Sequence, residues 1–247
     1  MSNEKKKLDG EIFQKKSKNI RGIDRSSNQT SGQKPELYKV YQNVTSRIQL
    51  PKPEFSPDTR FWDIINKRHS SRAFSIKPIS VMDLSLLLFG MSGLTRTFPN
   101  FAFRTVPSAG AKFPIEIYPI INNVSKVKEG VYHYNIQNHE LELLKGGNFR
   151  KAFTNACYGQ KMVTRSAVIF ILTAMIDRTR ITYGERSYRY IYLDGGHVGQ
   201  NLYLAAEALG LNTCVIGRYY DDEINELLDL DENSEFTIYM GVVGKRR

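Results

Sequence analysis

Residues 67–74 of this chain read KRHSSRAF, a short basic run with two serines between its two arginines. Arg68 and Arg72 can supply guanidinium forks, while Ser70 and Ser71 can supply hydroxyl and backbone N–H donors. These are the groups that a phosphate monoester needs. The run therefore predicts a phosphate-binding turn. A solvated charged turn is the alternative, since short basic runs are common on protein surfaces.

A helix is predicted on each side of this turn. Upstream, residues 56–58 (Ser-Pro-Asp) are a start signal for an apolar helical pattern that should end near Arg68. Downstream, residues 80–83 (Ser-Val-Met-Asp) resemble a capping box and lead into apolar residues on one helical face. Gly90 and Gly93 are expected to close this second helix.

Residues 104–111, which read RTVPSAGA, follow as a run of small residues. Backbone in such a turn can approach a ligand closely. A plain loop before a strand is the alternative at this position.

The rest of the chain alternates strand-like and helix-like segments. The run at 166–175 is nearly all apolar, as expected for a central strand buried on both faces. The predicted strands are 115–121, a hairpin of 130–134 with 141–144, 166–175, 212–217 and 236–243, and the predicted helices are 149–158 and, longest of all, 186–209.

Gly195 and Gly196 interrupt the longest helical pattern, and each costs about 1 kcal/mol relative to alanine. Close packing of a subunit partner or a cofactor ring would explain them. A plain break in the helix is the alternative.

This order of elements indicates an α+β domain with one central mixed sheet. No Gly-x-Gly-x-x-Gly follows a predicted strand, so a Rossmann dinucleotide site is unsupported. Neither a Gly-x-Ser-x-Gly elbow nor a Gly-Lys-Ser/Thr phosphate loop occurs. Residue patterns alone thus predict a domain that binds a phosphate-bearing ligand.

The formal charge of +10 is divided between two parts of the 247-residue chain. Residues 1–35 hold nine lysines and arginines against four acidic residues, about +5, and are predicted to be a basic, flexible tail. Residues 36–58 are predicted to be an extension packed against the domain, and residues 59–247 the domain itself. Because no zinc-finger spacing or aromatic RNA-binding motif accompanies the charge, nucleic acid is not expected as a partner.

Other classes of protein are excluded by what the composition lacks. The two cysteines, Cys157 and Cys214, lie in apolar contexts, so a disulfide framework is not expected and the chain is predicted to be cytoplasmic. No apolar run approaches the roughly 20 residues of a membrane span, and no signal peptide is predicted. The four histidines fall at no ligand spacing with the cysteines, so no metal site is expected.

Taken together, the motifs resemble the FMN-dependent nitroreductase superfamily, and within it the SagB-type, azoline dehydrogenase-like branch. The resemblance implies a three-layer fold, a central mixed β-sheet flanked by helices, with FMN at the interface of a homodimer. The matching segments are 68–72, 107–111, 183–190, 195–202, and 208–211 continuing to 215–217.

The resemblance also assigns roles to single residues. Arg68 and Ser70 would hold the FMN phosphate with Lys245 and Arg247, and His69 belongs to the same cofactor-binding motif. The other cofactor-binding residues that it implies are Arg72, Pro107, Ser108, Ala109, Gly110, Gln160, Ile216 and Gly217.

The resemblance implies how these residues would contact the flavin. Arg72 would stabilise the negative charge of reduced flavin at its pyrimidine edge. The 107–110 turn would contact flavin from the other subunit, and Gln160 would reach the ribityl chain or the ring edge. Ile216 and Gly217 would lie next to the flavin ring. The Gly217 N–H would point towards N5, and a side chain at this position would crowd the ring.

One departure from the branch concerns the candidate catalytic residues. Azoline dehydrogenases of this branch carry a Lys-Tyr pair where this chain has Thr182 and Tyr183. Tyr183 is left as the candidate acid or base, with Arg180 or Arg186 available to lower its pKa from about 10. The missing lysine puts azoline oxidation in doubt, whereas flavin binding does not depend on it.

Two classes of function therefore stay open. The first is an FMN oxidoreductase: either a dehydrogenase of a small or peptide-derived substrate, or a reductase that passes hydride from NAD(P)H to a nitro or quinone acceptor. The second is a catalytically silent flavin fold that serves as a subunit of a biosynthetic complex. The retained cationic and glycine positions favour the enzyme.

Overall fold

The computed structural model describes residues 9–18, 35–39, 41–55, 60–98 and 101–247. Its helices are α1 (Asp9–Lys16), α2 (Phe61–Lys67), α3 (Val81–Ser92), α4 (Arg150–Ala156), α5 (Lys161–Arg165), α6 (Asp177–Tyr183), α7 (Ser187–Ala208) and α8 (Asp221–Leu227). Its strands are β1 (Ser46–Gln49), β2 (Leu94–Phe98), β3 (Phe101–Arg104), β4 (Ile115–Ile121), β5 (Gly130–Asn135), β6 (Glu140–Gly146), β7 (Val168–Met175), β8 (Leu211–Ile216) and β9 (Glu235–Lys245).

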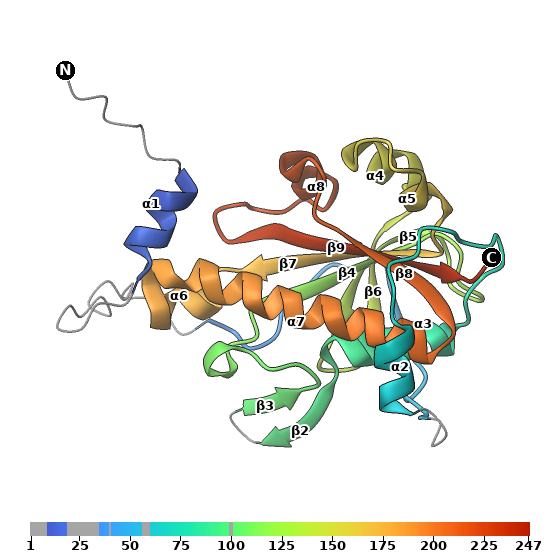
Figure 1. Cartoon of the computed structure of the whole chain (residues 1–247), viewed down its shortest axis with the longest axis horizontal. Helices are drawn as coiled ribbons and strands as arrows, with labels where there is room; N and C mark the ends of the chain where they lie inside the picture. The colour runs from blue at the N-terminus through green and yellow to red at the C-terminus, as the bar shows by residue number, and fades with distance from the viewer. Residues whose placement is uncertain (1–8, 19–34, 40, 56–59, 99–100) are drawn as a thin grey trace.

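Seven strands form the main sheet in the order β1-β6-β5-β4-β7-β9-β8 (Figure 1). Every neighbouring pair in it is antiparallel. The prediction of a mixed sheet is therefore wrong. The strands β7 and β8 precede and follow the long helix α7, and they point in the same direction. They form no parallel pair because β9 lies between them.

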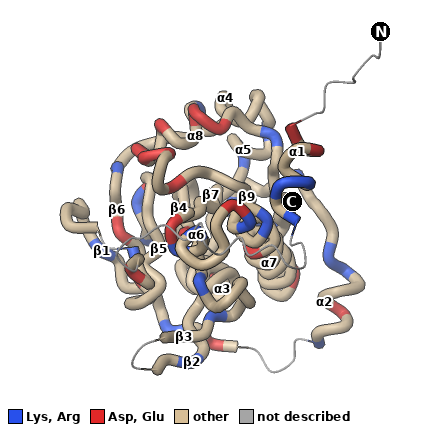
Figure 2. Tube along the Cα trace, turned by 90° about the vertical axis from the view of Figure 1, so that its left-hand side faces the viewer, with Lys and Arg blue, Asp and Glu red and all other residues tan. Residues whose placement is uncertain are grey.

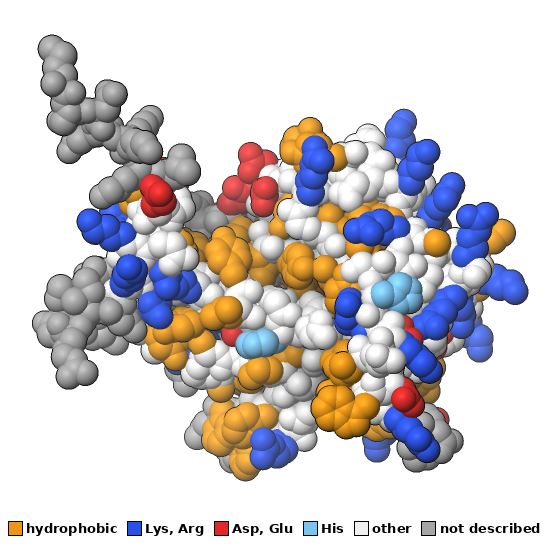
Figure 3. Space-filling view, in the orientation of Figure 1, with side chains coloured by type: hydrophobic (Ala, Val, Ile, Leu, Met, Phe, Trp, Pro, Cys, Tyr) orange, Lys and Arg blue, Asp and Glu red, His pale blue; other side chains and the backbone are white. Residues whose placement is uncertain are grey.

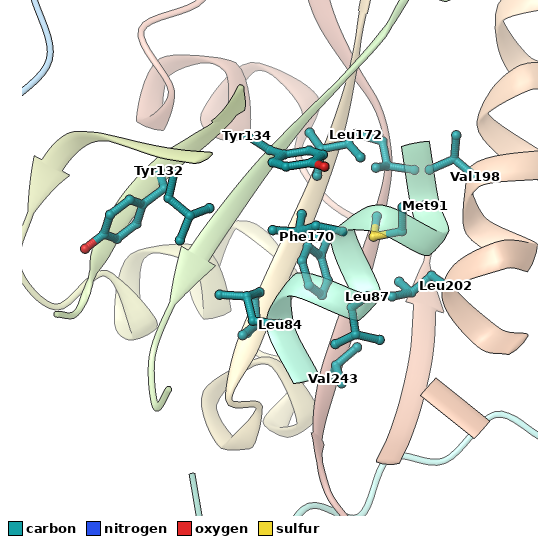
Figure 4. Packing of buried hydrophobic residues seen from close by; sticks show 14 of the residues in the cluster. Leu84, Leu87, Met91, Tyr132, Tyr134, Phe170, Leu172, Val198, Leu202 and Val243 are labelled. Carbon is teal, nitrogen blue, oxygen red and sulfur yellow. The ribbon is translucent and has the colours of Figure 1, made fainter. Parts of the chain in front are cut away.

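The sheet separates two apolar cores, which gives the molecule three layers. On β7, Phe170 and Leu172 face the larger core, whereas Ile169 and Ile171 face the other, the alternation expected of a strand. Helices α3 and α7 cover the larger core, as Figure 4 shows. Helices α4, α5 and α8 cover the opposite face. The apolar run of β7 is thus explained by helices on both faces, without parallel neighbours.

The predicted capping box begins α3. Ser80 Oγ accepts a hydrogen bond from the Asp83 N–H, and Asp83 Oδ2 accepts one from the Ser80 N–H, each at 2.9 Å. The helix runs through Gly90, which was expected to close it, and ends at Gly93. A Cβ at Gly90 would lie 3.1 Å from the Ala205 Cβ, so this glycine lets α3 pack closely on α7.

Helix α7 is continuous through both of its adjacent glycines, so the alternative of a plain helix break is wrong. A Cβ at Gly195 would lie 2.7 Å from Ile238 Cδ1, and one at Gly199 would lie 2.9 Å from Tyr239 Cε1, both on β9. A Cβ at Gly196 would meet nothing within 4 Å. Close packing on the chain's own sheet therefore explains Gly195 but leaves Gly196 on an open face.

The N-terminal region contacts the domain at several described places, among them β1 and Ser17. Strand β1 pairs with β6 at the edge of the main sheet, in register from Ser46 opposite Leu143. Ser17, just after α1, is buried and accepts hydrogen bonds from the Arg186 and Arg189 guanidinium groups. The start signal predicted at residues 56–58 lies outside the described residues, and α2 ends at Arg68 as expected.

Three findings bear on the excluded classes. Cys157 and Cys214 are both buried free thiols. Within the described part of the chain, no helix is both long and apolar enough to cross a bilayer, and no three His, Cys, Asp or Glu side chains come together as a metal site.

An ionic network is buried beside the β5–β6 hairpin. His133 Nε2 lies 2.9 Å from Glu116 Oε2, and His133 Nδ1 lies 2.9 Å from Glu142 Oε2. Burial alone would lower the pKa of His133, but hydrogen bonds to these carboxylates and their charges outweigh it and raise the pKa. The imidazolium form is therefore favoured in the folded protein.

We expect this histidine to make stability depend on pH. Its raised pKa contributes stability that is fully present below the unfolded value of about 6.5 and lost as pH rises through the folded value. The free energy of unfolding in urea should fall as the pH rises above about 6.5, and less steeply in His133→Gln. The exposed His69 provides the control, since His69→Gln should keep the wild-type slope. Equal slopes for wild type and His133→Gln would contradict the assignment.

Candidate functional site

The predicted phosphate turn lies against the free edge of the main sheet. The Ser71 N–H donates to the Thr213 carbonyl oxygen at 2.9 Å. Asn212 Nδ2 donates to the Ala73 carbonyl oxygen at 2.7 Å. These bonds anchor the backbone of the turn along β8.

Tyr203 on α7 organises the first half of this turn. Its hydroxyl lies 2.7 Å from Ser70 Oγ and accepts a hydrogen bond of 3.1 Å from the Val215 N–H. The Arg68 guanidinium lies over the tyrosine ring, with Cζ 5.2 Å from its centroid. Arg72 is exposed. In the described parts of the chain, neither arginine forms an ion pair.

Sequence reasoning missed Tyr203. It borders the buried face of α7 next to Leu202, and a mostly buried tyrosine needs a partner for its hydroxyl. Tyr203→Phe should leave the Val215 N–H unpaired and lower the free energy of unfolding by about 1–2 kcal/mol, measured in urea. Tyr192→Phe, on the exposed face of the same helix, is the matched control. A Tyr203→Phe protein as stable as wild type would show that the hydroxyl does not hold the turn.

The C-terminal segment meets the end of the turn, where Phe74 forms a β-bridge with Arg246, but two of its cationic side chains have partners of their own. Lys245 Nζ is 3.6 Å from Asp83 Oδ2, and the Arg246 guanidinium pairs with Glu207 at 2.8 Å. Arg247 lines a pocket of about 640 Å³ together with Arg150. Figure 2 shows the C-terminus beside β9. Among the described residues, these side chains form no hydrogen bond or ion pair with Arg68 or Ser70.

Three other predicted cofactor-binding residues meet where β8 ends. Ile216 is buried, whereas Gly217 is exposed. Gln160 Nε2 donates to the Arg218 carbonyl oxygen at 3.0 Å, which places it beside this glycine. A Cβ at Gly217 would have Tyr239 Cε2 at 4.0 Å as its only neighbour, so its backbone is open to a ligand.

The small-residue turn at 107–111 is attached to α7. Ser108 Oγ donates to Asp194 Oδ2 at 2.6 Å, and the Ala109 N–H donates to Asp194 Oδ1 at 3.3 Å. Burial raises the pKa of Asp194, although these two hydrogen bonds oppose the shift. Pro107 is exposed. Asp194 was not predicted, because nothing in its local sequence separates it from a helix-surface aspartate.

Tyr183, the candidate acid or base, lies beside the same turn. Gly110 has a left-handed φ of +57°, and a Cβ there would collide with the Tyr183 hydroxyl. The Tyr183 ring packs edge-on against Tyr190, with centroids 4.8 Å apart. Thr182 is half-buried next to it.

The two arginines expected near Tyr183 have other partners. Arg186 Nε donates to the Tyr190 hydroxyl at 2.9 Å, and Arg180 pairs with Asp177 at 2.6 Å. Among the described residues, neither guanidinium forms a hydrogen bond with the Tyr183 hydroxyl. The expected activation of that hydroxyl by a neighbouring guanidinium therefore stays a prediction.

Within one protomer, the site residues form two groups on α7. The 107–111 turn and Tyr183 lie near Asp194, and the phosphate turn lies near Tyr203. These helix residues are nine positions apart, about 13 Å along the axis.

Comparison with known proteins decides the family. The model of the nitroreductase family matches residues 65–245, which include both groups of site residues. The chain belongs to the nitroreductase family. A protein of Methanocaldococcus jannaschii, provisionally named a nitroreductase, is 35% identical to this chain over 202 residues. The match covers 82% of this chain and 98% of that protein.

Other relatives confirm the resemblance to the SagB-type branch. The trifolitoxin-processing protein TfxB of Rhizobium leguminosarum is 33% identical over 166 residues, or 62% of this nitroreductase-family chain. The match spans only 44% of TfxB. The microcin B17-processing protein McbC of Escherichia coli is also a relative.

A solved structure supports the fold. A chain of the Escherichia coli microcin synthetase McbBCD complex, with truncated pro-MccB17 bound, superposes with a TM-score of 0.62 at 17% identity. The superposition covers 96% of this chain and 86% of that one. The α+β nitroreductase-like fold is therefore confirmed, with the sheet antiparallel throughout.

Proposed function

We propose that this nitroreductase-family chain is an FMN-dependent oxidoreductase that acts as a homodimer on a peptide-derived substrate. The observation that carries the proposal is the pair of guanidinium groups at Arg68 and Arg72. They are held at the edge of the sheet, and neither has a carboxylate partner among the described residues. Such cations suit a bound phosphate.

The residues present fit FMN on chemical grounds. Arg68 and Ser70, with Lys245 and Arg247, would hold its phosphate, and the open backbone of Gly217 leaves room for a flat ring. FMN supplies a centre that accepts or releases hydride. The chain's own part is to hold the phosphate and to keep side chains away from the ring.

A homodimer would unite the two groups of site residues. Since the 107–111 turn is about 13 Å from the phosphate turn along α7, a partner's turn is better placed to complete the flavin site. Tyr192 and Leu193 leave 55% and 61% of their surfaces exposed on α7. Hydrophobic side chains gather over this helix in Figure 3.

Light scattering should therefore give about twice the chain mass of 28.3 kDa. Leu193→Glu would place charges of the same sign at the proposed interface and should shift the protein towards monomer, by at least about tenfold in dimer dissociation constant. Lys151→Glu, on exposed α4, is the control. A flavin-loaded monomer of the wild-type chain would refute the dimer.

The peptide-derived substrate rests on relatives and on Tyr183. TfxB and McbC are named as processing proteins of trifolitoxin and microcin B17. By analogy, this chain would remove hydride from a carbon of a peptide-derived heterocycle while Tyr183 takes the proton from the adjacent position.

Thr182 favours a second candidate. Without a lysine at this position, proton removal lacks one helper, so a reductase that uses NAD(P)H and a nitro or quinone acceptor is the alternative. An absorbance spectrum of the purified protein, followed by anaerobic titration with NADH and NADPH, tests both. A colourless protein that takes up no added FMN would end the flavin proposal, and bleaching by a nicotinamide would favour the reductase.

A further inference from the structure

A second pocket lies beside the turn that carries Gly110. It has a volume of about 360 Å³, which is enough for a small acid or one amino-acid residue. Its lining includes Phe101, Phe103, Gly110, Ile181, two cationic residues (Lys112 and Arg178) and one acidic residue, Glu36. Since Gly110 also adjoins the Tyr183 hydroxyl, the pocket borders the candidate catalytic residue.

Arg178 is the unusual member of this lining. The residue is only 4% exposed. Its Nε donates to the Glu36 carbonyl oxygen at 3.0 Å, and its Nη1 donates to the Phe113 carbonyl oxygen and to Glu116 Oε1. Its Nη2 is buried and has no hydrogen-bond partner among the described residues. Because buried N–H groups are nearly always paired, this nitrogen needs an acceptor.

The surrounding charges point to an anion as that acceptor. Arg104, on β3, is also buried, and its Nη2 likewise lacks a partner within the described chain. Burial lowers the pKa of Arg104 to about 10, and the charge of Arg178 adds to this effect while Glu116 opposes it. Glu116 is further shared with His133. Two buried guanidinium groups therefore depend largely on one buried carboxylate, and in the pocket lining Arg178 and Lys112 outnumber Glu36, which leaves an excess of positive charge.

The outer wall of the pocket is aromatic. On the β2–β3 hairpin, the rings of Phe98 and Phe101 stack with centroids 4.5 Å apart, although 43% and 47% of their surfaces are exposed. Phe103 completes this wall, with the Arg96 guanidinium 4.5 Å from its centroid. Hydrophobic side chains gather over this hairpin in Figure 3. The wall suits an apolar or aromatic group attached to the anion.

We propose that this pocket binds the carboxylate of an apolar or aromatic acid, through Arg178 and Lys112, with the attached side group against Phe101 and Phe103. The pocket would thereby hold an anionic end of the substrate next to Tyr183. That this acid is the substrate rests on the function proposed above. Binding of the acid to the pocket does not depend on that function.

Calorimetric titration of the full-length protein tests the pocket with two probes that differ in charge alone. N-acetyl-L-phenylalanine should bind about tenfold more tightly than N-acetyl-L-phenylalaninamide, because only the acid offers a carboxylate. Lys112→Glu should abolish that preference. Phe101→Ala should weaken both probes by a similar factor of about three to ten. Lys151→Glu, which makes the same charge change on α4, should bind as wild type does.

A peptide ending in phenylalanine then separates two sources of the carboxylate. Comparable binding of the peptide and the small acid indicates a peptide terminus, and exclusion of the peptide indicates a free acid. Equal binding of acid and amide, or no binding of either at about 10 mM, overturns the pocket. The flavin spectrum of the same sample distinguishes the two proposals. Bound FMN without a preference for the acid would contradict only the acid-binding pocket. A preference for the acid in a colourless protein would contradict only the FMN proposal.

Discussion

Arg68→Ala is expected to weaken FMN binding by about 10- to 100-fold. A charge-assisted contact to a phosphate dianion contributes about 1.5–3 kcal/mol, and Arg68 has no carboxylate partner among described residues that could share it. Fluorescence titration of the apoprotein with FMN measures the change. Arg47→Ala, an exposed arginine on β1 at the opposite edge of the main sheet, should bind FMN as wild type does.

Two further measurements make this result specific. Because Arg68 also lies over the Tyr203 ring, the variant should lose about 0.5–1 kcal/mol of unfolding free energy, too little to explain a large loss of FMN. Arg247→Ala tests the C-terminal cation, which lines a pocket with Phe74 at the end of the phosphate turn. Unchanged FMN affinity in Arg68→Ala would place the phosphate elsewhere, and a loss confined to Arg247→Ala would place it at the C-terminus.

The secondary structure could be predicted because its causes are local. The capping pair Ser80 and Asp83, the apolar period of α7 and the run at β7 each depend on residues within a few positions. Strand order depends instead on contacts between distant parts of the chain. No local signal predicts that β9 lies between β7 and β8. This placement removes the parallel pair that the predicted mixed sheet would contain, so the sheet is antiparallel throughout.

The candidate site divides in the same way. The turn at 67–74 and the small-residue turn at 107–111 were found because several suitable residues lie together in sequence. Tyr203 and Asp194, which hold these turns, were missed because each is one polar residue in a long helical pattern, with its partner far along the chain. The unpaired Nη2 of Arg178 could not be predicted either, since it depends on burial and on the distant Glu116.

Tyr183→Phe is expected to slow substrate-driven flavin reduction by about a hundredfold or more while leaving FMN bound. In a dehydrogenase, a base must take the proton from the carbon next to the one that loses hydride, and a positioned acid or base contributes about 10²- to 10⁴-fold. The Tyr183 hydroxyl adjoins Gly110 in the turn proposed to contact flavin. Loss of the hydroxyl removes the base but adds no bulk, so the turn and the flavin should keep their positions.

The donor that is used decides whether this role is real. NADH or NADPH already carries a transferable hydride and needs no base, so a reductase should be reduced equally fast with and without the Tyr183 hydroxyl. Anaerobic stopped-flow reduction of wild type, Tyr183→Phe and the neighbouring control Tyr190→Phe by both nicotinamides separates the cases. Fast reduction that ignores the Tyr183 change would remove this tyrosine from the mechanism. If neither nicotinamide reduces the wild type, the enzyme is a dehydrogenase of another donor, and the hundredfold loss in Tyr183→Phe should then appear with a peptide-derived heterocycle.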